Sequence, residues 1–175
     1  MTYDLQDLKD LEGKNNNGGV KTRFYFAPES AFAEGGIQEV DADGVTISTP
    51  HAFKPGEGFS EIYATLDGAE LKLDSVGERD GRGKAPAGEF FHPGNTVAAA
   101  QFDIVSKNRP GILLVEEMDG TIVQYGAAGL PIEISGAYTS GKQSGTRRGW
   151  TFTVSGYQNG MQHYTGDIAL KRNAV

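Results

Sequence analysis

Glycine and turn-forming dipeptides divide this chain into many short segments, and this feature most limits what it can fold into. Glycine accounts for 25 of the 175 residues, about twice its ordinary frequency. The glycines follow no fixed period, unlike those of repeat proteins. Threonine, valine and aromatic residues, which favour strands, are frequent between them. The pattern predicts short β-strands joined by turns.

The composition excludes several classes of protein. The chain has no cysteine, which rules out a disulfide framework, a thiol nucleophile and a zinc–thiolate site. The longest run of large apolar residues is Ile112–Val115, so we expect no membrane-spanning segment and no membrane partner. The opening sequence MTYDLQDLKD lacks the basic start and apolar stretch of a secretory signal.

Alternation of apolar and other residues predicts most of the strands. Asp67-Gly68 and Asp119-Gly120 are favoured two-residue turns. They predict two hairpins, one pairing residues 61–66 with 69–73 and the other pairing 112–117 with 121–125. The expected strands are residues 20–26, 45–48, 61–66, 69–73, 112–117, 121–125, 131–138, 150–155 and 163–170.

One helix is expected, beginning after an N-cap at Asn95 and ending near Asn108. Its apolar stripe would consist of Ala98, Phe102 and Val105. Residues 27–60 are expected to be mostly irregular. Residues 77–94 show little periodicity and predict a long loop, and long loops in compact domains are usually functional.

The first nineteen residues are expected to form an arm. Leu5, Leu8 and Leu11 are spaced by three, which favours one or two helical turns. Residues 15–19, NNNGG, then interrupt any helix. The predicted organisation is an arm at 1–19 and a single domain at 20–175. The expected fold is mainly β: an antiparallel β-sandwich or partly closed barrel with one flanking α-helix and long loops.

Charge is unevenly distributed along the chain. Residues 1–70 carry 13 acids and 5 bases, whereas residues 133–175 carry 2 acids and 5 bases, among them Lys142, Arg147 and Arg148. One interpretation is an ordinary surface with fluctuating composition. The other is a subunit with an acidic and a basic end, which would stack head to tail on its own copies. A net charge of −7 argues against a nucleic-acid reader.

No residues form a recognisable catalytic, cofactor-binding or metal-binding motif. Residues 136–142 match the start of a phosphate-binding loop, but Gln143 stands where a Ser or Thr is needed and a strand follows. His51, His92 and His163 are far apart without ligand spacing. The prediction is a protein that is not an enzyme and binds no cofactor or metal.

Phe90 and Phe91 are the large apolar residues of the expected loop at 77–94. One reading is that they pack on the helix that follows. The alternative is contact with a neighbouring subunit, because aromatic residues dominate contacts between proteins.

Three stretches together resemble the tail tube proteins of long-tailed bacteriophages. The first is NGGVK running into the strand RFYF. The second is EFFHPGN, then the expected helix, then GILLVEEMDGTIVQYG. The third is SGK followed by RGWTFTVSG and YTGDI.

This resemblance implies a β-sandwich with one flanking helix, six copies of which form a ring whose inner sheets join into one barrel. Rings would stack into a tube in the virion, assembled in the host cytoplasm, through which the genome passes. An acidic lumen would repel the DNA in passage. Partners would be further copies and other tail proteins at the tube ends. The candidate contacts between subunits are Leu5, Leu8, Leu11, Phe90, Phe91, Lys142, Arg147 and Arg148, with the arm and the loops 77–94 and 139–149 joining the rings.

Other functions remain open at the level of sequence. The same assembly would suit the inner tube of a contractile injection system or another tail or capsid component. A carbohydrate-binding β-sandwich is a second class, and it requires a row of exposed Trp and Tyr on one sheet face. An enzyme with an unrecognised site is the third.

Overall fold

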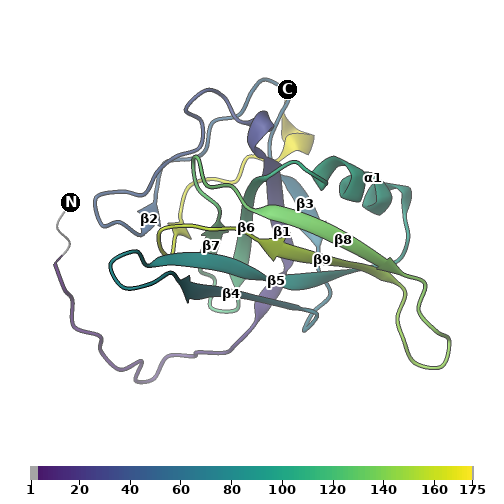
Figure 1. Cartoon of the computed structure of the whole chain (residues 1–175), viewed down its shortest axis with the longest axis horizontal. Coiled ribbons are helices and arrows are strands. Elements are labelled where there is room, and N and C mark those ends of the chain that lie inside the picture. The colour runs from purple at the N-terminus through teal and green to yellow at the C-terminus, as the bar shows by residue number, and fades with distance from the viewer. Residues whose placement is uncertain (1–3, 175) are drawn as a thin grey trace.

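Two β-sheets and one α-helix make up the computed structural model, which describes residues 4–174 (Figure 1). One sheet has six strands in the order β2-β10-β7-β6-β1-β3 and the other has four in the order β4-β5-β9-β8. The two sheets stay separate and form a sandwich, not a closed barrel, so the expected mainly β fold is confirmed. The elements are β1 (Val20–Pro28), η1 (Glu29–Ala31), β2 (Thr46–Ile47), β3 (Ser60–Tyr63), β4 (Ala69–Val76), β5 (Gly83–Pro93), α1 (Val97–Ser106), β6 (Gly111–Glu117), β7 (Ile122–Tyr125), β8 (Glu133–Thr139), β9 (Gly149–Ser155), β10 (His163–Tyr164) and η2 (Lys171–Asn173).

The main core lies between the two sheets. Phe24 of β1 meets Phe90 of β5 with ring centroids 4.8 Å apart, and Phe90 lies 5.3 Å from Phe152 of β9. A second buried cluster covers the other face of the six-stranded sheet, where Phe32 and Phe59 of the connection between β1 and β3 pack against Leu114. Strand β6 is therefore buried on both faces, which explains its unbroken apolar run.

The hairpin expected at residues 61–73 is wrong. Strand β3 pairs with β1 and β4 pairs with β5, so the two segments belong to different sheets. The turn itself is present, since Asp67 has a φ of 58°, but it carries the chain across the sandwich. Thr65 N–H donates to the carbonyl oxygen of Phe91 at 2.8 Å and fixes this crossing.

The long loop expected at residues 77–94 is also wrong, because Gly83–Pro93 forms the eleven-residue strand β5. The glycines and prolines of this segment obscure its alternation of apolar and polar residues, but the strand accommodates them. Pro86 lies opposite Leu73, and Lys84, two residues earlier, directs its N–H to Gln158, away from β4. The donor that proline lacks would therefore also point away from β4.

Helix α1 begins one residue later than expected. Thr96, not Asn95, is the N-cap, and its Oγ1 accepts from the Ala99 N–H at 3.2 Å. The buried face contains Ala99 and Ser106 with half-buried Phe102. Of the predicted stripe only Phe102 lies on this face, because Ala98 and Val105 are exposed.

The helical turns expected around Leu5, Leu8 and Leu11 are absent from residues 4–19, which form an irregular arm. The arm has one turn at residues 12–13, where Lys14 N–H donates to the Leu11 carbonyl oxygen at 2.9 Å. It continues from β1 and runs away from the side of the molecule that carries α1 (Figure 1).

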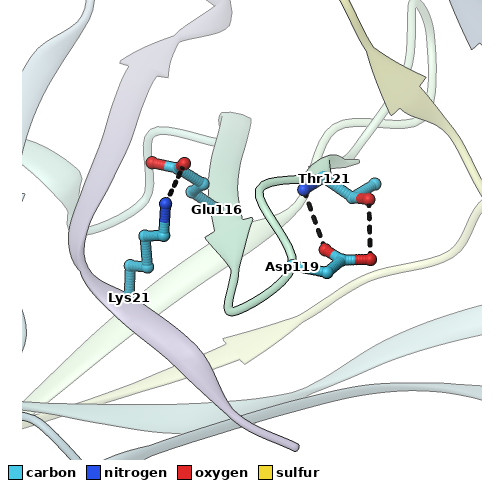
Figure 2. A network of polar contacts seen from close by, with 4 residues as sticks. All are labelled: Lys21, Glu116, Asp119 and Thr121. Atoms are coloured by element: carbon cyan, nitrogen blue, oxygen red, sulfur yellow. Dashed lines mark hydrogen bonds and ion pairs between the residues drawn. The ribbon is translucent and has the colours of Figure 1, made fainter. Parts of the chain in front are cut away.

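The hairpin expected at residues 112–125 is confirmed, because β6 pairs with β7. Figure 2 shows how polar side chains close this end of the sheet. Lys21 of β1 forms an ion pair with Glu116 of β6. The Asp119 carboxylate accepts from the Thr121 N–H at 2.9 Å and from its hydroxyl at 3.0 Å, and these bonds lower the pKa of Asp119.

Candidate functional site

The four-stranded sheet has two open edges. Strand β4 pairs only with β5 and β8 only with β9, and no strand within residues 4–174 occupies the other side of either. An isolated bridge between Gly111 and Ile132, the residue before β8, closes only the start of the β8 edge. Unpaired N–H and C=O groups along a sheet edge are a template for pairing with another chain.

The hydrogen-bonding pattern identifies the free groups of β4. The Phe91 N–H donates to the Gly68 carbonyl oxygen at 3.0 Å, immediately before this strand. Since residues of an antiparallel strand direct their backbone groups alternately to the two sides, the even-numbered residues of β4 pair with β5. The outward groups belong to Ala69, Leu71, Leu73 and Ser75.

The same reasoning applies to β8. The Gly94 N–H donates to the Arg148 carbonyl oxygen at 3.0 Å, so even-numbered residues of β9 face β5 and odd-numbered residues face β8. Their β8 partners are also odd-numbered, as in Ser135 opposite Thr153. The outward groups of β8 therefore belong to Ile134, Gly136 and Tyr138.

The face of this sheet turned away from the core carries mostly small or charged side chains. It has four acids and one base, and its large apolar residues are half-buried Val76 and Phe91, which lies buried under Arg147. The small, hydroxyl and charged members are Glu70, Lys72, Asp74, Ala85, Ala87, Glu89, Glu133, Ser135, Ala137, Thr151, Thr153 and Ser155. Such a surface offers little for the phosphates of DNA to bind.

The basic residues predicted as contacts lie on the hairpin between β8 and β9, which extends beyond the sheet (Figure 1). Lys142 and Thr146 bridge the hairpin, with the Lys142 N–H donating to the Thr146 carbonyl oxygen at 2.9 Å. Lys142 and Arg148 are exposed. The hairpin thus presents two cationic side chains to solvent.

Arg147 and Phe91, two of the predicted contact residues, lie against each other in the structure. The Arg147 Cζ lies 3.8 Å from the centroid of the Phe91 ring, a cation–π contact. Phe91 is buried.

The loop position expected for Phe90 and Phe91 is corrected, because both lie in strand β5. Phe90 is 0% exposed and points into the core between the sheets. Its alternation with Phe91 places the two rings on opposite faces of the sheet. In this structure Phe90 stabilises the core, and only Phe91, through Arg147, adjoins the predicted contact surface.

The arm leucines are exposed to an unusual degree. Leu5 and Leu8 are fully exposed and Leu11 is half exposed. Fully burying a leucine is worth about 1.5–3 kcal/mol, so these side chains would gain considerably from an apolar partner surface.

Sequence reasoning missed an apolar groove between α1 and β3. It has a volume of about 440 Å³, and its walls include Tyr63, Ala98, Phe102 and Val105. The helix wall of the groove, Ala98, Phe102 and Val105, is the predicted apolar stripe. The sequence therefore supplied these residues but not the partial exposure that leaves a groove beside them.

His51 has a structural environment. Its Nδ1 accepts from the Gln38 N–H at 3.0 Å and its Nε2 lies 2.7 Å from Oε1 of Gln124, an arrangement that requires the neutral ring with its proton on Nε2. Burial lowers the pKa of His51. His92 is held by the Tyr63 carbonyl oxygen, 2.8 Å from its Nδ1. In the part of the chain described, no three acidic or histidine side chains gather in a way that would hold a metal ion.

Trp150, the single tryptophan, gives no support to a carbohydrate-binding face. Its ring is half-buried against the core, 5.4 Å from Tyr138 and 6.0 Å from Phe152 between centroids. Its Nε1 is buried and has no acceptor among the described residues.

No helix within residues 4–174 has the length and apolar character needed to cross a bilayer. No protein-family model matches the chain, and the searches of curated proteins and of solved structures found no match. The class defined by the fold is therefore a β-sandwich with two open sheet edges, an exposed arm and a basic hairpin.

Proposed function

We propose that this chain is a structural subunit of a bacteriophage tail tube, in which β4 of one copy pairs with β8 of the next to close a ring. The observation that carries the proposal is the pair of open edges on the four-stranded sheet. The edge strands are of nearly equal length, with eight residues in β4 and seven in β8. Ring closure would pair both edges of this sheet with a neighbour.

The direction of the strands supports this joining. All neighbouring strands of the sheet are antiparallel, and the sheet has an even number of them. Strands β4 and β8 therefore run in opposite directions, and a rotated copy placed beside β8 presents its β4 antiparallel to it. The alternation continues around the ring without a parallel pair, which is the more stable arrangement.

The outer face of the sheet supports a lumen. In a ring joined through β4 and β8, one face of the continuous sheet lines the channel. The face that carries Glu70, Asp74, Glu89 and Glu133 would repel DNA and let it pass without adhering.

The charge distribution supports stacking of rings. The hairpin between β8 and β9 presents Lys142 and Arg148 at one end of the sheet. The described part of the arm carries Asp4, Asp7, Asp10 and Glu12 against two lysines. Opposite charges on different parts of one subunit steer copies into a head-to-tail contact.

A proline on the open edge tests the ring. Ser75 is exposed, and its N–H points outward from β4. Ser75→Pro removes that donor, and proline is tolerated on an edge strand, so the subunit should fold but fail to form rings. Ser75→Ala loses the hydroxyl that accepts from Lys84 but keeps the N–H, and it should assemble like the parent chain.

Electron microscopy and sedimentation of the concentrated protein provide the readout. We expect rings or striated rods from the parent and from Ser75→Ala, and monomers with a native circular dichroism spectrum from Ser75→Pro. Assembly of Ser75→Pro at the parent's concentration would exclude pairing through β4. A parent chain that stays monomeric at every concentration and salt would overturn the tube proposal.

A further inference from the structure

The apolar groove between α1 and β3 lies beside the edge of the six-stranded sheet. Strand β3 is the last strand of that sheet, next to β1. The groove has Phe102 and Val105 of α1 on one side and Ile62 and Tyr63 of β3 on the other. Tyr63 and Val105 are each about half exposed, at 48% and 47%. The groove therefore offers apolar surface next to strand backbone.

The outer edge of β3 is covered at both ends but open between them. The Ala64 N–H donates to Thr22, so even-numbered residues face β1 and odd-numbered residues face outward. Phe59 already pairs outward with residues 169 and 171, and the Tyr63 carbonyl oxygen is held by His92. The N–H and C=O of Glu61 lie between these two, without a hydrogen-bond partner among the described residues. One residue of an extended segment would satisfy both groups.

The arm supplies a segment of the right chemistry. It is irregular and carries three leucines, two of which are fully exposed. In this structure the arm runs away from α1 (Figure 1) and leaves the groove of its own subunit vacant. Exposed leucines on one part of the chain and an apolar groove on another are complementary between copies.

Charge at the rim of the groove favours the arm. Arg23 and Arg172 approach the same carboxylate, Glu61, at 3.8 and 3.2 Å. Two guanidinium groups share one negative charge, and both side chains remain more than 60% exposed. Residues 4–14 carry four acids and two lysines, so an arm in the groove would place carboxylates near this surplus positive charge.

We propose that residues 4–14 of one copy dock in the groove between α1 and β3 of a second copy, where an arm leucine enters the groove and the arm backbone pairs with Glu61. The inference rests on the proposed function in one respect, namely that the chain associates with itself. It adds a second contact, distinct from the one between β4 and β8.

Disulfide trapping tests the contact directly, because the chain has no cysteine of its own. Two single variants of the full chain, Leu8→Cys and Ala98→Cys, are mixed under mild oxidation by oxidised glutathione. Ala98 lines the groove. The matched control mixes Leu8→Cys with Val97→Cys, since Val97 is on the same helix, is 75% exposed and does not line the groove.

We expect about tenfold more heterodimer with Ala98→Cys than with Val97→Cys, because docking raises the effective concentration of the two thiols. Equal yields would overturn the proposal. The chain carrying both Leu8→Cys and Ala98→Cys, oxidised at low concentration, tests docking in the same subunit. An intrachain disulfide there with no heterodimer in the mixture would also overturn it.

A charge placed in the groove gives an independent readout. Val105→Glu should weaken association about tenfold, a difference of about 1.4 kcal/mol, whereas Val97→Glu should leave it unchanged. Rings that form without trapping at position 98 would refute arm docking and leave the tube proposal standing. Trapping at position 98 without rings at any concentration would support docking and refute the tube.

Discussion

The guanidinium group of Arg147 lies over the ring of Phe91, with Cζ 3.8 Å from the ring centroid. Arg147 belongs to the hairpin between β8 and β9, and Phe91 belongs to β5. The contact joins the base of the projecting hairpin to a central strand of the sheet. Arg147 therefore contacts its own chain, whereas Lys142 and Arg148 are the cations of this hairpin that remain for the proposed contact with a second copy.

Removing the Arg147 side chain should reduce stability modestly. Arg147→Ala deletes a cation–π contact worth about 0.5–1 kcal/mol at an exposed site, together with the packing of the arginine stem on the ring. We expect the free energy of unfolding, measured in urea, to fall by about 1 kcal/mol. Arg148→Ala is the matched control and should leave it unchanged. Equal losses in the two variants would show that the contact with Phe91 contributes nothing.

Reversing the two free cations should impair assembly without affecting the fold. The double variant Lys142→Glu, Arg148→Glu should keep the parent's urea midpoint, because both side chains are exposed. Its association, followed by sedimentation, should weaken, and that of the parent should weaken with added salt. Arg79→Glu, an exposed reversal in the turn between β4 and β5, is the control. Unchanged association of the double variant would eliminate the electrostatic contact.

Gly88 should tolerate no side chain. It has a φ of 149° within β5, and a Cβ there would lie 2.1 Å from the Glu70 carbonyl oxygen. Gly88→Ala should lower the free energy of unfolding by about 2 kcal/mol or more. Gly81→Ala, where the nearest atom is 4.0 Å away, should be nearly neutral. Thermal unfolding of both variants measures this difference in stability. A Gly88→Ala variant as stable as the parent would contradict the close approach of β5 to β4.

His51 should make the protein less stable in acid. Burial lowers the pKa of this histidine from its ordinary value of 6.5. Below pH 6.5, the His51 ring therefore binds a proton more readily in the unfolded chain than in the folded chain. The free energy of unfolding should therefore fall as the pH drops below 6.5, by at most about 1.4 kcal/mol per pH unit for one proton. Urea titrations between pH 8 and pH 5 measure this slope.

Two variants isolate the contribution of His51. His51→Gln removes the titrating ring and should flatten the slope between pH 8 and pH 5, although it also lowers stability by disturbing the bonds to Gln38 and Gln124. His92→Gln should retain the parent's slope. If His51→Gln keeps the full pH dependence, another group is responsible.

Sequence patterns predicted the elements whose burial is regular. In β1 and β9, successive residues point to opposite sides of the sheet, one side toward the core between the sheets and the other toward solvent or the second buried cluster. The periodicity of the sequence therefore revealed both strands. The turn at Asp119-Gly120 joins neighbouring strands, so the expected hairpin was correct there. The same dipeptide type at Asp67-Gly68 joins different sheets, because turn chemistry sets the bend and not the partner of the strand that follows.

The surface suggested here for contact between copies was less accessible to sequence reasoning. Strand β5 contains Pro86 and Gly88, which interrupt its alternation of apolar and polar residues. Its position between β4 and β9 is evident only from the structure. The groove beside α1 depends on which helical face meets the core, and the burial of Ser106 in place of Val105 was not encoded in hydrophobicity. The charges of the hairpin and the arm were predictable from the sequence, because a charged side chain in solvent needs no partner elsewhere in the fold.

The arm continues directly into β1, and β1 lies between β6 and β3 with an antiparallel ladder on each side. Backbone hydrogen bonds of such ladders are perpendicular to the strands. A pull on the arm along β1 would therefore load both ladders in shear, so that many bonds resist at once and none is peeled off singly. Tension entering the molecule at residue 19 would pass into β1, the strand next to the edge of the six-stranded sheet, and would be shared by its two ladders, so the arm is firmly anchored to the sheet.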